Sequence, residues 1–134
     1  AVRDLHLANR IVPVVGDLAG DRAVREIGRV LDEMDLRLSA FYASNVEFYV
    51  WRAGTFGRWA DNLAALPAAD DAVVIRSYFP NFGGDHPSAL PGYYATQTLQ
   101  PVATVVAARE GRPFGSYWDV VTRDVLELGV GAGR

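Results

Sequence analysis

Residues 11–34, IVPVVGDLAGDRAVREIGRVLDEM, decide the predicted fold. Five mostly apolar residues are followed by a Gly-Asp turn, and then by apolar residues at the i, i+3, i+4, i+7 spacing of an amphipathic helix. A second apolar run, LSAFYASN, comes soon after the helix. The order is therefore β-α-β, which predicts a parallel sheet with a ligand-binding edge where the strands end.

The rest of the chain continues this pattern. We predict strands at 11–15, 38–42 and 72–76, with helices at 20–34 and 56–65, the second capped by Thr55. A Pro- and Gly-rich loop should span 79–92, followed by a helix that starts at Pro101 and a short helix after Ser116. The fold class is α/β, with a small, mostly parallel sheet and helices on both faces.

Length and composition exclude several classes of protein. The 134 residues fit one α/β domain over residues 1–124 and a glycine-rich tail over 125–134. A net charge of -3 gives no basic surplus for nucleic acid. Cysteine is absent, so the chain has no disulfide, thiolate zinc site or cysteine nucleophile, which fits the cytoplasm. No apolar run approaches the roughly 20 residues that a membrane span requires.

Four ordered blocks carry a resemblance to a known family: VPVVGDLAGDRAVREIG, AFYASNVEFYVW, WADNLAALP and VVIRS. Over residues 10–77 the chain resembles the C-terminal part of an uncharacterised bacterial family that is grouped with S-adenosylmethionine-dependent methyltransferase-like folds. The resemblance implies a Rossmann-like fold and S-adenosylmethionine as the cofactor. Members of the family are longer at the N-terminus, and the first residue here is Ala1, so we expect a partial domain from a larger protein.

The first candidate site lies at Gly16 and Asp17, where the strand at 11–15 should end. A carboxylate at the carboxyl end of a parallel strand can accept hydrogen bonds from ribose hydroxyls or act as a general base, so we assign both residues to cofactor binding. The alternative is that Asp17 caps the following helix and complements its dipole. The turn, DLAGD, has too few glycines for a phosphate-binding loop.

The second candidate site follows the strand at 38–42. By resemblance to amino-methyltransferases, Ser44 and Asn45 would hold the acceptor nitrogen of a substrate, and Glu47 could take its proton. Asn45 and Glu47 are also ordinary residues for a helix N-cap and a first helical turn. Arg76, at the end of the third strand, could bind an anion, and its guanidinium would then share one crevice with Asp17 and Asn45. Strand ends also turn polar simply where they meet solvent.

Metal and hydrolase chemistry are not predicted. The two histidines, His6 and His86, are far apart in sequence and lie in no metal-binding spacing. No Gly-x-Ser-x-Gly motif occurs. The loop around Gly83 to His86 could act as a lid over the crevice. Catalytic residues stay unassigned.

The tail sequence VLELGVGAG, residues 125–133, matches the glycine pattern with which methyltransferases of this fold open their cofactor site. That motif works between a strand and a helix, and because no helix follows here we expect an irregular glycine-rich tail. The leading hypothesis is a methyltransferase-like domain that binds a small molecule. The alternative is a non-catalytic binding or oligomerisation module, which would form a homo-oligomer through the aromatic side chains of residues 41–59.

Overall fold

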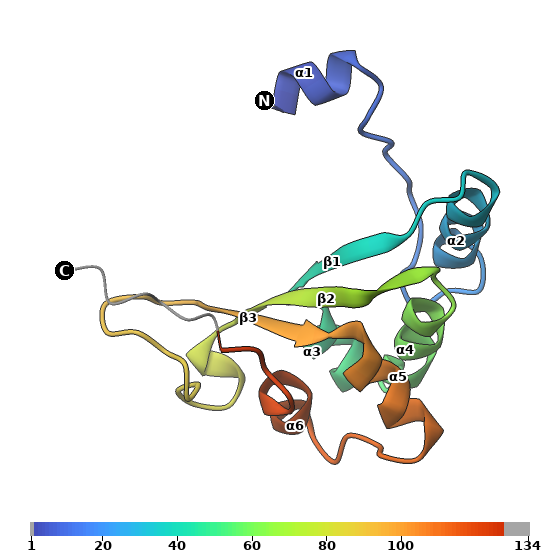
Figure 1. Ribbon diagram of the computed structural model, residues 1–134. Coiled ribbons are helices and arrows are strands. Elements are labelled where there is room, and N and C mark those ends of the chain that lie inside the picture. The colour runs from blue at the N-terminus through green and yellow to red at the C-terminus, as the bar shows by residue number, and fades with distance from the viewer. Residues whose placement is uncertain (1, 128–134) are drawn as a thin grey trace.

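The computed structural model describes residues 2–127 as a mixed α/β fold with a three-stranded open sheet and flanking helices (Figure 1). The strands and helices, in chain order, are α1 (Val2–Leu7), α2 (Ala23–Glu33), β1 (Leu38–Ser44), α3 (Val46–Arg52), α4 (Phe56–Ala64), β2 (Ala68–Tyr78), the 3₁₀ turn η1 (Pro80–Phe82), β3 (Thr96–Pro101), α5 (Val102–Glu110) and α6 (Tyr117–Thr122).

The sheet is mixed, so the prediction of a mostly parallel sheet is wrong. The strand order is β1-β2-β3, with β1 parallel to β2 and β2 antiparallel to β3. β3 was not predicted, because its sequence TQTLQP combines polar side chains with a proline that we assigned to the next helix. Pro101 is in fact both the last residue of β3 and the N-cap of α5. The loop predicted at 79–92 therefore connects two antiparallel strands.

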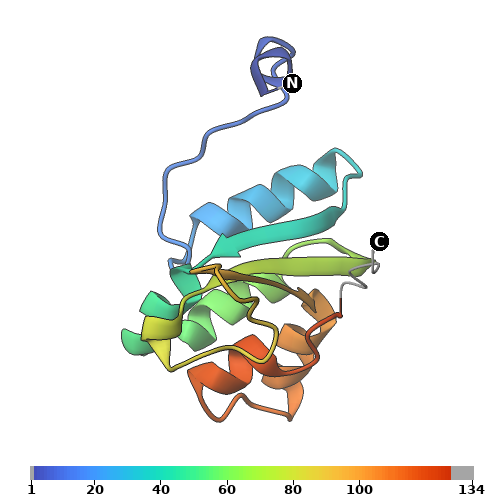
Figure 2. The same ribbon diagram turned by 90° about the vertical axis from the view of Figure 1, so that its left-hand side faces the viewer.

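The predicted strand at 11–15 is also wrong, because these residues form no strand. Residues 2–15, here called the N-terminal arm, run away from the sheet and end in α1 (Figure 2). Val12 and Val15 have exposed fractions of 78% and 101%. An extended segment needs a neighbouring strand for its backbone hydrogen bonds, and the structure places none beside the arm.

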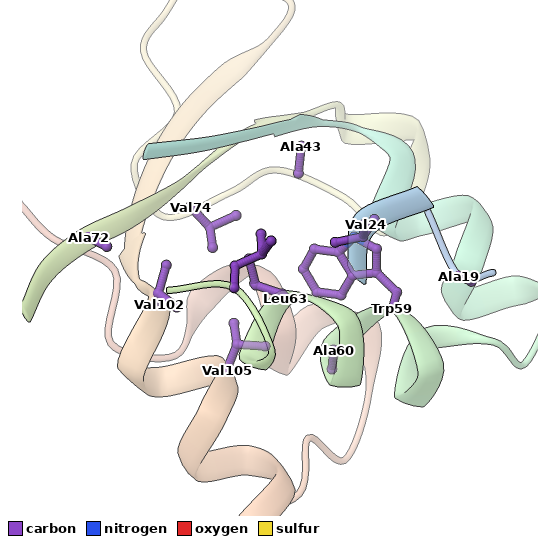
Figure 3. Close-up of a cluster of buried hydrophobic side chains, with 11 residues drawn as sticks. Ala19, Val24, Ala43, Trp59, Ala60, Leu63, Ala72, Val74, Val102 and Val105 are labelled. Atoms are coloured by element: carbon purple, nitrogen blue, oxygen red, sulfur yellow. The ribbon is translucent and has the colours of Figure 1, made fainter. Parts of the chain in front are cut away.

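The core lies between the sheet and helices α4 and α5 (Figure 3). Trp59 and Leu63 of α4 and Val105 of α5 are each at most 1% exposed. They pack beneath the sheet with Val74 of β2 and Ala43 of β1. Burial of large apolar side chains is the main stabilising contribution to a domain of this size.

The other face of the sheet is open. Helices α3 to α6 gather on one side of the strands (Figures 1 and 2). On the opposite face Ala40 and Gln97 are exposed, and Tyr42 is 64% exposed. The prediction of helices on both faces is therefore wrong for this sheet, which forms a two-layer arrangement.

Most of the predicted helices are confirmed, with shorter bounds. The helix predicted at 20–34 is α2, and the one predicted at 56–65 is α4. The Ser116 hydroxyl accepts a hydrogen bond from the Asp119 amide at 3.2 Å, which confirms the predicted cap of α6. Thr55 occupies the N-cap position of α4, but its side chain donates to the Val50 carbonyl instead.

Candidate functional site

The carboxyl end of β1 forms one side of the candidate site. The pairing of β1 with β2 shifts register between Tyr42 and Ser44, and Ser44 has a left-handed backbone with φ of 51°. This conformation costs a residue with a side chain on the order of 1 kcal/mol. It turns the chain out of the sheet, so that Asn45 follows at the start of α3.

The turn that contains Asp17 lies at the same end of the sheet. Ala19, two residues further on, is 3% exposed and belongs to the same buried cluster as Ala43 of β1 (Figure 3). The Asp17 Oδ1 atom accepts a hydrogen bond from the Ala19 amide at 2.9 Å. The N-cap of α2 is Arg22, and it makes no side-chain cap. Asp17 therefore shapes its own turn rather than capping the helix, and its side chain remains exposed.

Two residues fix the position of this turn. A Cβ atom on Gly16 would lie 2.2 Å from the Cβ of Ala23, so only glycine fits there. Asn62 of α4 is 2% exposed, and its Nδ2 atom donates to the carbonyl oxygens of Leu18 at 2.9 Å and Gly20 at 2.7 Å. Asn62 was not predicted as a site residue, although its position as a polar residue beside Leu63 on the apolar side of the helix is a signal for such a role.

We call Gly16, Asp17, Ser44 and Asn45 the ligand edge. The Asn45 side chain is half-buried and, although it occupies the N-cap position of α3, makes no cap hydrogen bond. The structural alternative is therefore confirmed for the N-cap position of Asn45, but not for a cap hydrogen bond from its side chain. Asp17 and Asn45 present a carboxylate and an amide of the kind that bind hydroxyl and amine groups.

Aromatic side chains line the start of α3. The rings of Phe48 and Phe82 stack with their centroids 3.9 Å apart, and Tyr117 contacts Phe48 edge-on at 5.2 Å. Tyr49 is 57% exposed and contacts the same Phe48 ring. The start of α3, directly after Asn45, therefore carries a cluster of packed aromatic rings.

Glu47 and Arg76, predicted as substrate contacts, bind each other instead of facing the crevice. Both side chains are 1% exposed. The Arg76 Nη2 atom donates to Glu47 Oε1 at 3.0 Å, and Nε donates to Oε2. Arg76 also lies two residues before the end of β2, on the face that the helices cover, so it shares no crevice with Asp17 and Asn45.

Burial controls the electrostatics of this pair. Loss of solvent raises the pKa of Glu47, while the charge of Arg76 and its hydrogen bonds oppose that shift. The pKa of Tyr117 in α6 is also raised, first by burial and then by the nearby charge of Glu47. Arg76 Nη1 has no hydrogen-bond partner among residues 2–127. We call Glu47, Arg76 and Tyr117 the buried polar cluster.

The loop predicted to act as a lid is anchored. His86 is 5% exposed, and its Nδ1 atom accepts a hydrogen bond from the Ser88 amide at 3.1 Å. With Nδ1 accepting, Nε2 carries the proton and donates to the Val121 carbonyl of α6 at 3.0 Å. The Tyr78 hydroxyl donates to the Gly84 carbonyl at 3.0 Å. These bonds hold the loop against α6 and β2.

A groove lies elsewhere on the described surface, away from the ligand edge. This groove of about 700 Å³ runs along β3 and is bounded by the loop at 87–95 and by residues 125–127. No residue of the ligand edge lines it. The Leu126 amide donates to the Leu99 carbonyl at 2.8 Å, so the chain returns along β3. The glycines of the predicted tail motif lie outside the described residues.

Metal ligands do not gather at the site. Residues 2–127 contain no group of three or more His, Asp or Glu side chains arranged to hold a metal ion. His6 lies in α1 and is exposed, whereas His86 is buried beside α6.

Comparison with known proteins identifies the family of the chain but assigns it no activity. Residues 1–116 match the model of a domain of unknown function, DUF7790. A search of curated proteins finds no match for the chain. In the part of the chain that the structure describes, no helix has the length and apolar character needed to cross a membrane.

Proposed function

The chain belongs to the DUF7790 family, and we propose that it is a Rossmann-like domain of the S-adenosylmethionine-dependent methyltransferase type that binds a small molecule at the ligand edge. The observation that carries the proposal is the position of the Asp17 turn and Ser44–Asn45 at the carboxyl end of β1, which is parallel to β2. Ligands of open α/β sheets bind at this end of the strands.

Each residue of the ligand edge has a distinct role in this proposal. Asp17 accepts hydrogen bonds from the ribose hydroxyls of the cofactor, because Ala19 engages only one of its carboxylate oxygens. Gly16 lets the backbone pass close to α2. Ser44 and Asn45 contact the acceptor group of the substrate. Glu47 and Arg76 act indirectly, by fixing α3 against β2 so that Asn45 is held in place.

The domain is, in this proposal, the C-terminal part of a larger cytoplasmic protein. The N-terminal arm supports this view, because Val12 and Val15 are 78% and 101% exposed. The absence of cysteine is consistent with a reducing compartment. Upstream residues would then complete the cofactor site.

The test is calorimetric titration of S-adenosylmethionine and S-adenosylhomocysteine into this chain and into a chain extended at its N-terminus. We expect the longer chain to bind both compounds and Asp17→Ala to weaken binding at least tenfold. Asp21→Ala is the matched control, because Asp21 lies nearby and makes only an exposed ion pair with Arg58. Absence of binding by both chains would overturn the proposal.

A second candidate is a non-catalytic module that only binds or assembles. The internal pairing of Glu47 and Arg76 favours it, because neither group is available as an acid, a base or an anion contact at the surface. Under this candidate Asp17→Ala changes no affinity for S-adenosylmethionine, whereas substitutions on exposed apolar surface change the assembly state measured by light scattering.

A further inference from the structure

The outer edge of β1 and residues 11–15 of the N-terminal arm both lack a neighbouring strand. β1 is the first strand of the sheet, and among residues 2–127 only β2 pairs with it. Residues 11–15 of the N-terminal arm have the composition of a buried strand, yet Val14 is 54% exposed and Val15 fully so. An unpaired edge and an unpaired apolar strand each attract a strand from another chain.

The arm does not reach the edge of its own sheet. It leaves the turn at Gly16 and runs away from β1 in both views (Figures 1 and 2). The tight contact between Gly16 and Ala23 fixes the start of this path, since any reversal there must separate the two residues. The arm therefore lies away from its own sheet and is accessible to a second molecule.

We propose that two copies of this chain exchange their arms, and that residues 11–15 of each copy pair with the β1 edge of the other. Each copy supplies one arm and one edge, so a twofold arrangement satisfies both and closes the assembly. Residues 11–15 are shorter than the seven-residue β1, so all five can pair along its edge.

Pro13 explains why this assembly stops at two copies. Backbone groups of alternate residues in a strand face opposite sides, so Val12 and Val14 can bond to β1 while the nitrogen of Pro13 faces outward. Proline has no amide hydrogen and is tolerated on the outer side of an edge strand. The exchanged strand therefore presents an interrupted outer edge that resists further pairing.

Exposed apolar side chains near the β1 edge enlarge the apolar surface available to a bound arm. Val30 of α2 and Met34, the C-cap residue of that helix, are 43% and 63% exposed, and Leu36, just before β1, is 46% exposed. Helix α2 enters the core through Val24, and among residues 2–127 only β2 is hydrogen-bonded to β1. An arm bound at the β1 edge would adjoin these residues and remove apolar area from water.

The absence of cysteine allows a direct test by disulfide trapping. One preparation carries Val12→Cys, and separate preparations carry Ser39→Cys, Ala40→Cys or Phe41→Cys, so that both faces of β1 are sampled. After mixing and mild oxidation, we expect a disulfide-linked heterodimer with at least one β1 variant. Glu110→Cys, exposed on α5, is the control and should give at least tenfold less product.

Three further measurements decide the outcome. Light scattering should give the mass of a dimer for the unmodified chain, a monomer for Val14→Asp, and larger assemblies for Pro13→Val, which restores the outward amide. A monomeric unmodified chain without the heterodimer would overturn the proposal. So would a disulfide formed within single chains of the Val12→Cys, Ala40→Cys double variant. The proposal does not rest on ligand binding, so failure of the calorimetric test leaves it standing.

Discussion

The buried polar cluster and the ligand edge each contain a carboxylate side chain, Glu47 and Asp17. The first is buried and paired, and the second is exposed. Glu47 and Arg76 lie under the helices, have almost no contact with solvent and form an ion pair with each other. Asp17 is exposed, and the Asn45 side chain does not cap its helix. A polar residue near a strand end is therefore a candidate ligand contact only if it faces outward and is not already bound.

The contrast has an energetic basis. A buried ion pair contributes little net stability, because desolvation of both charges offsets their attraction, but the loss of one partner leaves a buried charge uncompensated. An exposed carboxylate such as Asp17 has no such constraint and can be replaced at little cost to folding. Substitutions should separate the two regions clearly.

The largest effect is expected at Arg76. Arg76→Met leaves the Glu47 carboxylate buried without its partner, and we expect the free energy of unfolding to fall by about 3 to 5 kcal/mol, measured by urea denaturation. The double variant with Glu47→Leu should recover much of this loss. A fall of less than about 1 kcal/mol in Arg76→Met would show that the pair is not a buried structural unit.

A smaller effect is expected at Asn62, which connects α4 to the turn of the ligand edge. Asn62→Ala leaves two carbonyl oxygens without a donor, and we expect a loss of about 2 kcal/mol in unfolding free energy. Amide hydrogen exchange at Ala19 and Gly20 should accelerate, while exchange in β2 should change only in step with global stability. Unchanged exchange in the turn would contradict the anchoring role.

Gly16 tests the shape of the ligand edge. Gly16→Ala places a methyl group against Ala23, and overpacking of this kind costs about 1 to 3 kcal/mol. We expect the lower end of that range, because the residue is exposed and the turn can shift. In the double variant with Ala23→Gly, thermal unfolding should return toward the parent midpoint. Additive losses in the double variant would mean that the two residues do not meet.

The smallest effect concerns α6, which covers the buried polar cluster. Hydrogen bonds from Arg123 lower the pKa of Asp119 below its usual 3.8. Because the pKa is lower in the folded state, ionised Asp119 stabilises the fold above pH 3.8. This stabilisation is lost as the pH falls through the pKa of the folded state. Urea midpoints measured from pH 5 to pH 2.5 should therefore fall less steeply in Asp119→Asn than in the parent. Parallel curves would exclude the contribution.

Local patterns predicted the helices well, and non-local pairing accounts for the errors. The spacing of apolar residues in α2 and α4 depends on neighbouring residues alone, and both helices are confirmed. Whether residues 11–15 form a strand depends on a partner that no local pattern specifies. The antiparallel β3 was missed for the same reason, since its pairing with β2 crosses a long loop.

The candidate site at 16–17 and 44–45 was proposed from the apolar runs that precede these residues. The run before 44–45 forms β1, whereas residues 11–15, which precede Gly16 and Asp17, form no strand. The pairing of Glu47 with Arg76 joins residues 29 positions apart, and the position of Tyr117 beside them depends on how α6 packs. Such contacts arise only from the assembled fold, which is why Arg76 could not be distinguished from a ligand contact by sequence.

The measurement that tests the account most directly is a residue-resolved NMR titration of the N-terminally extended chain with S-adenosylhomocysteine. We predict chemical-shift changes that saturate together at Gly16, Asp17, Ser44 and Asn45, while the Arg76 side-chain signal keeps its position. Saturating changes at Arg76 and Tyr117 with none at the ligand edge, or no changes at all, would contradict the assignment of the two regions.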